Sequence, residues 1–134
     1  HYHLAETICS PRPISSPRPP ILVGGSGERK TLRLVARYAD ACNLFALDPA
    51  EVAHKLDVLE RHCADVERDP ADIRRTILAM VDPLTDVDGF LASMEGYASL
   101  GVQLVEVMPL VEDPVAWATR LGEQVIPRLV DIGV

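Results

Sequence analysis

Short apolar runs alternate with segments of helical periodicity four times after residue 20, and this alternation limits the possible folds more than any other feature. The apolar runs lie at 21–23, 41–45, 76–81 and 102–108, and the helical segments at 28–40, 48–66, 87–100 and from 113 onward. Segment 28–40 shows the period: Leu32, Val35, Ala36 and Ala39 recur at the spacing of one helix face. Strands that alternate with helices through short connections predict an α/β fold with four parallel strands.

Capping signals support the second helical segment. Asp48 precedes Pro49 and stands three residues before Glu51, a combination typical of a helix N-terminus. We expect Glu51 and Lys55 to pair on the outer surface at i, i+4. The expected buried face consists of Val52, Leu56, Leu59, Cys63 and Val66. For the later helices, Gly101 predicts a C-terminal cap and Pro127 a kink.

Two architectures are compatible with this order of elements. A right-handed series that curls in one direction places all four helices on one side of the sheet, as in a (βα)8 barrel, and leaves the other side bare. A doubly wound sheet reverses once and has helices on both faces. Runs such as ILV and TILAMV are apolar on both faces, which is typical of parallel strands covered on both sides.

Composition indicates which binding partners and which cellular compartment we expect for the protein. The chain has 20 acidic and 13 basic residues and a net charge of −7, which argues against nucleic acid or anionic membranes as partners. No apolar run approaches the ~20 residues of a membrane helix, and the first residues lack the apolar stretch of a signal peptide. Cys9, Cys42 and Cys63 form neither a disulfide framework nor a CxxC site. We therefore expect a cytoplasmic protein.

Proline dominates the start of the chain, at positions 11, 13, 17, 19 and 20. Proline lacks a backbone donor and favours extended geometry. We expect residues 1–20 to be an extended lead-in and residues 21–134 to form one partial domain of four βα units.

Glycines gather where the first apolar run ends, in the sequence Gly24-Gly25-Ser26-Gly27, and Arg29 and Lys30 follow at the start of the next helical segment. Glycines at a strand end let backbone amides approach a ligand, and a helix N-terminus favours an anion. Two cations in a first helical turn oppose the macrodipole, so a bound anion would explain them. The alternative is a tight strand-to-helix turn with solvated cations.

This glycine loop matches neither of the two best-known phosphate-binding fingerprints. A Walker A loop counted from Gly24 has Arg29 where glycine is required, and GxGxxG counted from Gly25 has Lys30 in that place. The residues alone therefore leave the phosphate site and the simple turn both open.

Two polar residues interrupt apolar strands. Asn43 shares a strand face with Ala41 and Phe45, and is either a ligand contact or a satisfied polar group. Glu106 lies in the C-terminal part of the fourth strand, where barrel enzymes place their chemistry, or at a solvated rim.

Other kinds of site find little support. His54 and His62 lie at different positions around their helix and do not converge as in HExxH, so we expect no metal site. No GxSxG motif and no pair of carboxylates suited to acid/base work is present, so no catalytic residue can be assigned. Arg29, Arg33 and Arg37 form a basic stripe that is either solvated or faces an anionic cofactor tail.

Residues 18–45, RPPILVGGSGERKTLRLVARYADACNLF, closely resemble the luciferase-like monooxygenase superfamily, and within it the oxidoreductases that use the deazaflavin coenzyme F420. The resemblance continues through residues 48–73, DPAEVAHKLDVLERHCADVERDPADI, and the earlier SPRP prolines are similar to the family's lead-in. It implies that the chain is the C-terminal half of a (βα)8 TIM-type barrel.

The resemblance also implies a site. Gly24, Gly25, Ser26 and Gly27 would be backbone donors to the cofactor's phosphate, and Arg29 or Lys30 would add positive charge. Asn43 would lie beside the cofactor ring. The family's first four βα units supply its catalytic groups and much of its substrate pocket, and they are not in this sequence.

The expected function is that of a fragment or truncated form of an F420-dependent oxidoreductase, which transfers a hydride between the deazaflavin and a small organic substrate. One alternative is a monooxygenase that uses reduced FMN on the same scaffold. Another is a non-catalytic half-barrel that self-associates, because half a barrel exposes a large apolar sheet face. We therefore expect pairing with another copy or with an N-terminal half.

Overall fold

The computed structural model describes residues 3–45, 48–108, 111–130 and 132. Four strands form its sheet: β1 (Leu22–Gly24), β2 (Ala41–Phe45), β3 (Arg74–Ala79) and β4 (Leu104–Val107). The helices are α1 (Thr31–Tyr38), α2 (Pro49–Ala64), α3 (Val87–Ser99), α4 (Pro114–Gln124) and α5 (Ile126–Leu129), with a 3-10 turn, η1 (Pro70–Asp72), before β3. Each strand is followed by a helix, as predicted.

The four strands are parallel and lie in the order β1-β2-β3-β4. Every connection between neighbours therefore advances in the same direction, and the order of strands does not reverse. A doubly wound sheet requires such a reversal, so that architecture is excluded for the described strands. The chain has the fold of four successive βα units of a (βα)8 barrel.

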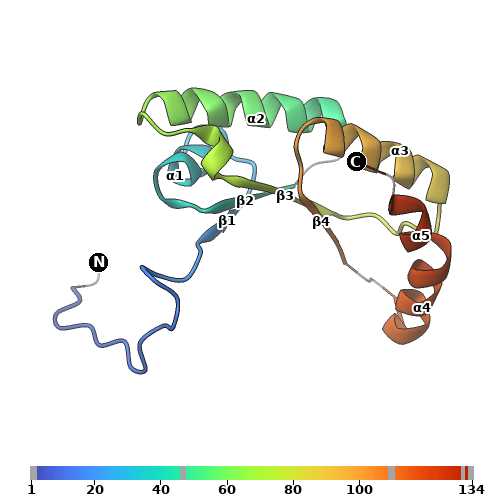
Figure 1. The fold of residues 1–134 in the computed structure, drawn as a ribbon, viewed down its shortest axis with the longest axis horizontal. Coiled ribbons are helices and arrows are strands. Elements are labelled where there is room, and N and C mark those ends of the chain that lie inside the picture. Colours follow the sequence, from blue (N-terminus) through green and yellow to red (C-terminus); the bar gives the residue numbers. More distant parts are fainter. Residues whose placement is uncertain (1–2, 46–47, 109–110, 131, 133–134) are drawn as a thin grey trace.

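One face of the sheet packs against the helices and forms the core. Cys42, Leu44 and Ile77 are almost fully buried on this face. They pack with buried residues of three helices: Leu32, Val35 and Ala36 of α1, Val52, Leu56, Leu59 and Cys63 of α2, and Phe90, Met94 and Tyr97 of α3. Figure 1 shows α2 and α3 side by side along one side of the sheet.

The opposite face of the sheet, here called the open face, carries large apolar side chains that remain exposed. Leu22, Phe45 and Leu104 are 50%, 53% and 39% exposed, and strand register places all three on this face. Within the described residues no helix covers them. The expectation of strands covered on both faces is wrong here, because all the βα connections fall on one side.

The first helix is shorter than periodicity predicts. It begins at Thr31, and Glu28, Arg29 and Lys30 form a turn before it. Lys30 is the N-cap and makes no capping hydrogen bond with its side chain. Arg29 and Lys30 therefore precede the first helical turn, and the expectation that both oppose the dipole from within it is wrong.

Strand ends differ from the sequence prediction because register across the sheet decides them. β1 ends at Gly24, which pairs with Asn43. β3 begins at Arg74, two residues before the predicted start, since the Arg74 amide donates to the Asp40 carbonyl. β4 is shorter than predicted, because the Val102 amide still bonds to the Tyr97 carbonyl at the end of α3.

Helix ends follow the expected caps. The Asp48 carboxylate accepts a hydrogen bond of 2.8 Å from the Glu51 amide. Gly101 has φ of +74°, the left-handed conformation typical of a residue after a helix C-terminus. The last helical segment is interrupted at Val125, and α5 starts at Ile126, beside Pro127. No helix of the described residues is long and apolar enough to cross a membrane.

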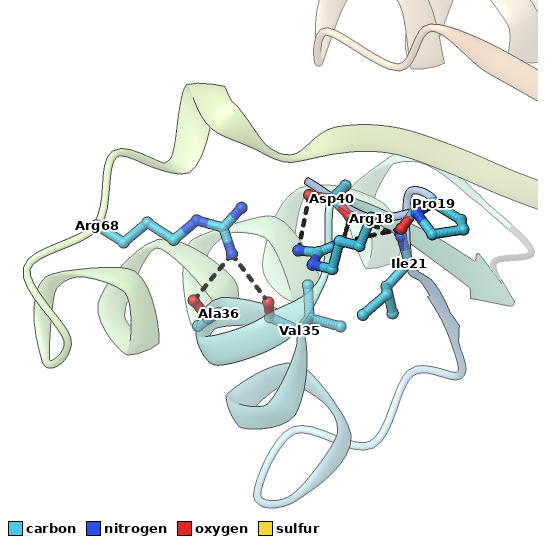
Figure 2. A network of polar contacts seen from close by, with 7 residues as sticks. All are labelled: Arg18, Pro19, Ile21, Val35, Ala36, Asp40 and Arg68. Atoms are coloured by element: carbon cyan, nitrogen blue, oxygen red, sulfur yellow. Dashed lines mark hydrogen bonds and ion pairs between the residues drawn. The ribbon is translucent and has the colours of Figure 1, made fainter. Parts of the chain in front are cut away.

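The segment before β1 is anchored at the start of β2 (Figure 2). The Arg18 guanidinium forms two hydrogen bonds with the Asp40 carboxylate, which also accepts the Ile21 amide at 2.6 Å. The hydrogen bond from Arg18 holds the pKa of Asp40 below its ordinary value. This contact fixes where the chain enters β1, although residues 3–20 contain no helix or strand and are all exposed.

Arg68, in the segment between α2 and β3, contacts the C-terminal half of α1 (Figure 2). Its guanidinium donates to the carbonyls of Val35 and Ala36 at 3.5 and 3.2 Å, in the last turns of α1. A cation at a helix C-terminus also interacts favourably with the helix dipole. The arrangement ties the segment between α2 and β3 to α1.

Candidate functional site

The glycine loop, residues 24–30, leaves the sheet at the C-terminal end of β1. Gly25 has φ of +119°, a conformation that other residues rarely adopt, and its amide donates to the Asn43 carbonyl at 2.9 Å. The Ser26 hydroxyl accepts from the Phe45 amide and donates to the Phe45 carbonyl, both at 2.9 Å. Gly25 and Ser26 therefore continue the hydrogen bonding to β2 for two residues beyond the end of β1.

These contacts change the expected set of donors. The Gly25 amide is engaged by β2, so it is not free to bind a phosphate, contrary to expectation. The Ser26 side chain is engaged as well. The amides of Ser26–Lys30, in contrast, donate to no group of the described residues. Five successive open amides before a helix N-terminus are suited to bind an anion.

Positive charge accompanies these amides. Arg29 and Lys30 are exposed and form no ion pair with the rest of the described chain. Arg33 and Arg37 are exposed too, further along α1. Because the whole chain carries a net charge of −7, the cations at this loop are a local feature.

Glu28 connects the glycine loop to α2. Its Oε1 accepts from Lys55 Nζ at 2.6 Å and lies 3.0 Å from His54 Nε2, and its carbonyl lies 2.8 Å from His62 Nε2. The hydrogen bond from Lys55 holds the pKa of Glu28 below its ordinary value. The predicted outer pair of Glu51 and Lys55 is wrong: the Lys55 side chain is only 15% exposed and binds Glu28.

Asn43 lies on the open face, at the level where β1 ends. It is paired in register with Gly24, which has no side chain, and a Cβ added to Gly24 would meet nothing within 4 Å. Asn43 Nδ2 donates to Glu106 Oε2 at 2.7 Å, across β3. Asn43 Oδ1 is buried and has no partner among the described residues.

The structure thus brings the sequence-predicted residues to one edge of the sheet. Gly24, Gly25, Ser26, Gly27, Arg29 and Lys30 form one loop, and Asn43 lies beside its start. Glu106, which was either a site residue or a rim residue, joins them through Asn43. This edge carries the C-terminal ends of the parallel strands, the edge on which barrel enzymes place their chemistry.

Sequence reasoning did not identify Lys55, His54 and His62 as neighbours of the loop. His54 and His62 are eight residues apart in the sequence, which separates them by about 80° around α2. No local pattern in the sequence therefore groups them or pairs them with Glu28. A group of three or more metal-ligating side chains is not found among the described residues.

The family comparison supplies the decisive observation. The family model described as luciferase-like monooxygenase matches residues 1–83, which include the glycine loop, β2 and α2. The chain belongs to this family. It is a family of oxidoreductases, and the match covers more than half of the sequence. No match is found among curated protein sequences.

Solved structures agree on the fold. The coenzyme F420-dependent tetrahydromethanopterin reductase from Methanopyrus kandleri superposes with a TM-score of 0.60 at 14% sequence identity. The superposition covers 81% of this chain and 50% of the reductase. The chain therefore spans about half the length of that reductase.

Proposed function

We propose that this chain supplies part of the cofactor site of an F420-dependent oxidoreductase, and that the amides of Ser26–Lys30 bind the phosphate of the coenzyme. The observation that carries the proposal is that these five amides donate to no described group, although they lie beside the exposed cations Arg29 and Lys30. Phosphate needs several donors and positive charge at one place, and the loop offers both.

Two features of the open face favour a position for the coenzyme ring beside Asn43. Gly24 leaves space beside Asn43, and Asn43 Oδ1 is a buried acceptor without a described partner. A buried polar atom without a partner is unfavourable, so a donor on a ligand ring would stabilise it. We assign Asn43 to the ring and the loop to the phosphate.

F420, when bound, accepts or donates the hydride, and the protein's task is to hold it in the right orientation. The loop fixes one end of the coenzyme through its phosphate. Glu106 holds the Asn43 amide nitrogen at 2.7 Å and thereby fixes which atoms of Asn43 face the site. The resemblance to the family implies that four further βα units would supply much of the pocket for the organic substrate.

Those further βα units are the partner that we propose for the open face. Leu22, Phe45 and Leu104 are exposed there, and β1 and β4 each have one edge that pairs with no strand of the described residues. Four more parallel strands would pair with both edges and cover the face, closing an eight-stranded barrel. A second copy of this chain or a companion half can supply them, and the mass of the assembly in solution distinguishes these two sources.

Fluorescence titration of the chain with F420 and, separately, with FMN tests the choice of cofactor. We expect saturable binding of F420, with weaker binding of FMN. Tighter binding of FMN would overturn the F420 assignment and favour the flavin-dependent monooxygenases of the same family.

A further inference from the structure

The glycine loop contains one negatively charged side chain, that of Glu28. Glu28 stands in the middle of Ser26–Lys30, the five residues whose amides find no acceptor in the described chain. A carboxylate close to open amides at a helix N-terminus can accept hydrogen bonds from them, and the helix dipole favours its negative charge there. Glu28 does not do so, because its carboxylate binds α2.

Among the side chains of α2 that contact Glu28, Lys55 holds the carboxylate most firmly. Its Nζ lies 2.6 Å from Oε1, and its side chain is 15% exposed. His54 contacts the same oxygen at 3.0 Å but is 56% exposed, so water screens that contact more. His62 contacts the carbonyl of Glu28 and not its carboxylate, so it fixes the main chain of the loop without holding the carboxylate.

We propose that Lys55 is a positioning residue of the anion site: it holds the Glu28 carboxylate on α2 and so keeps the loop amides open to a phosphate. This inference rests on the proposed function of the loop. In the absence of the Lys55 ammonium, the Glu28 carboxylate competes with phosphate for the same amides. The positive charge of Lys55 thus acts on binding through Glu28 and not through the ligand.

A double-variant cycle separates this role from a merely structural one. We expect Lys55→Met to weaken binding of inorganic phosphate and of F420 by about tenfold in the wild-type background, and by less than about twofold when it is made in a Glu28→Gln background. The double variant Lys55→Met/Glu28→Gln regains binding, because the competing carboxylate is gone. If the double variant binds as weakly as Lys55→Met alone, Lys55 acts only by supporting the loop and the proposal is wrong.

Arg61→Met is the matched control. It removes one positive charge from the same helix, and the Arg61 side chain contacts the Asp57 carbonyl of α2, not the loop. We expect its binding of phosphate to equal that of the wild type. A loss equal to that of Lys55→Met would mean that net charge alone explains the effect, which contradicts the proposal.

Hydrogen exchange tests the same claim without a ligand. At a pH above the ordinary Glu28 pKa of 4.5, we expect amides of residues 26–30 to exchange more slowly in Lys55→Met than in the wild type. Adding Glu28→Gln should abolish this protection. Unchanged exchange in Lys55→Met overturns the proposal. Failure of the wild type to bind phosphate or F420 would instead overturn the proposed function of the loop.

Discussion

Asn43 of β2 and Glu106 of β4 are joined by a hydrogen bond of 2.7 Å between Asn43 Nδ2 and Glu106 Oε2, across the strand that separates them. The two residues are 63 positions apart in the sequence. The other polar atom of the same amide, Asn43 Oδ1, is buried and has no hydrogen-bond partner among the described residues. The bond to Glu106 therefore fixes the orientation of the Asn43 amide, whose oxygen is left as an unsatisfied acceptor beside the glycine loop.

The first prediction concerns this pair. Asn43→Asp places a second carboxylate against Glu106, which raises the pKa of one of the two groups. We expect a loss of stability on the order of 1 kcal/mol at pH 7 that shrinks towards pH 4, where the pair takes up a proton. Thermal unfolding at the two pH values measures it.

Glu106→Gln is the control for that experiment. It removes the repulsion, so the double variant Asn43→Asp/Glu106→Gln should recover stability at pH 7. A loss in Asn43→Asp that is equal at pH 4 and pH 7 would show that charge repulsion is not its cause.

The second prediction concerns the glycines of the loop. Gly25 has φ of +119°, and a Cβ there would lie 3.4 Å from Thr31 Cγ2, so Gly25→Ala should cost about 1–3 kcal/mol of stability. Gly24 has open space for a Cβ, and Gly24→Ala should change stability by less than about 0.5 kcal/mol. Urea denaturation of both variants compares them, and equal losses would argue against the loop conformation described.

The third prediction concerns pH. The pKa of Glu28 is held below its ordinary value of 4.5, chiefly by the hydrogen bond from Lys55. A carboxyl whose pKa is lower in the folded than in the unfolded state stabilises the fold above the unfolded value and loses this effect as pH falls through the folded value. We expect the wild type to have a higher Tm than Glu28→Gln at neutral pH, and the gap to close in acid.

Other carboxyls titrate in the same range, so the test is the difference between the two proteins and not the wild-type curve alone. Asp40, for example, has a lowered pKa because of its hydrogen bond with Arg18, and it contributes equally to both proteins. A gap in Tm that stays constant from neutral to acid pH would show that Glu28 does not gain stability from ionisation.

The sequence predicted the type and order of the elements because each carries its signals locally. Leu32, Val35 and Ala36 mark the buried face of α1, and Asp48 and Gly101 mark helix ends. These signals depend on spacing within one segment, so they can be interpreted without knowing the rest of the fold.

Strand ends and contacts within the site were harder to predict from the sequence, because they depend on residues that the sheet brings together. Whether Gly24 belongs to β1 depends on its pairing with Asn43. Glu28 and Lys55 are 27 positions apart, and nothing local predicts their contact. The position of the loop was therefore predictable, whereas the donors that remain open in it were not.

The fourth prediction concerns the open face. Light scattering at micromolar concentration should detect an assembly larger than one chain, since Phe45 and Leu104 expose apolar surface there. Phe45→Asp should shift the assembly towards the monomer. Leu34→Asp is the control, because Leu34 is 50% exposed on α1, away from the sheet. A wild type that is monomeric at this concentration contradicts self-association and favours a companion half.

The most direct measurement is an NMR titration of the 15N-labelled chain with F420, and with inorganic phosphate as the minimal probe. We predict saturable shifts that are largest at the amides of Ser26–Lys30, with the Asn43 side-chain amide responding to F420 but not to phosphate. Shifts that are absent from these five amides, or that centre on another part of the chain, would contradict it.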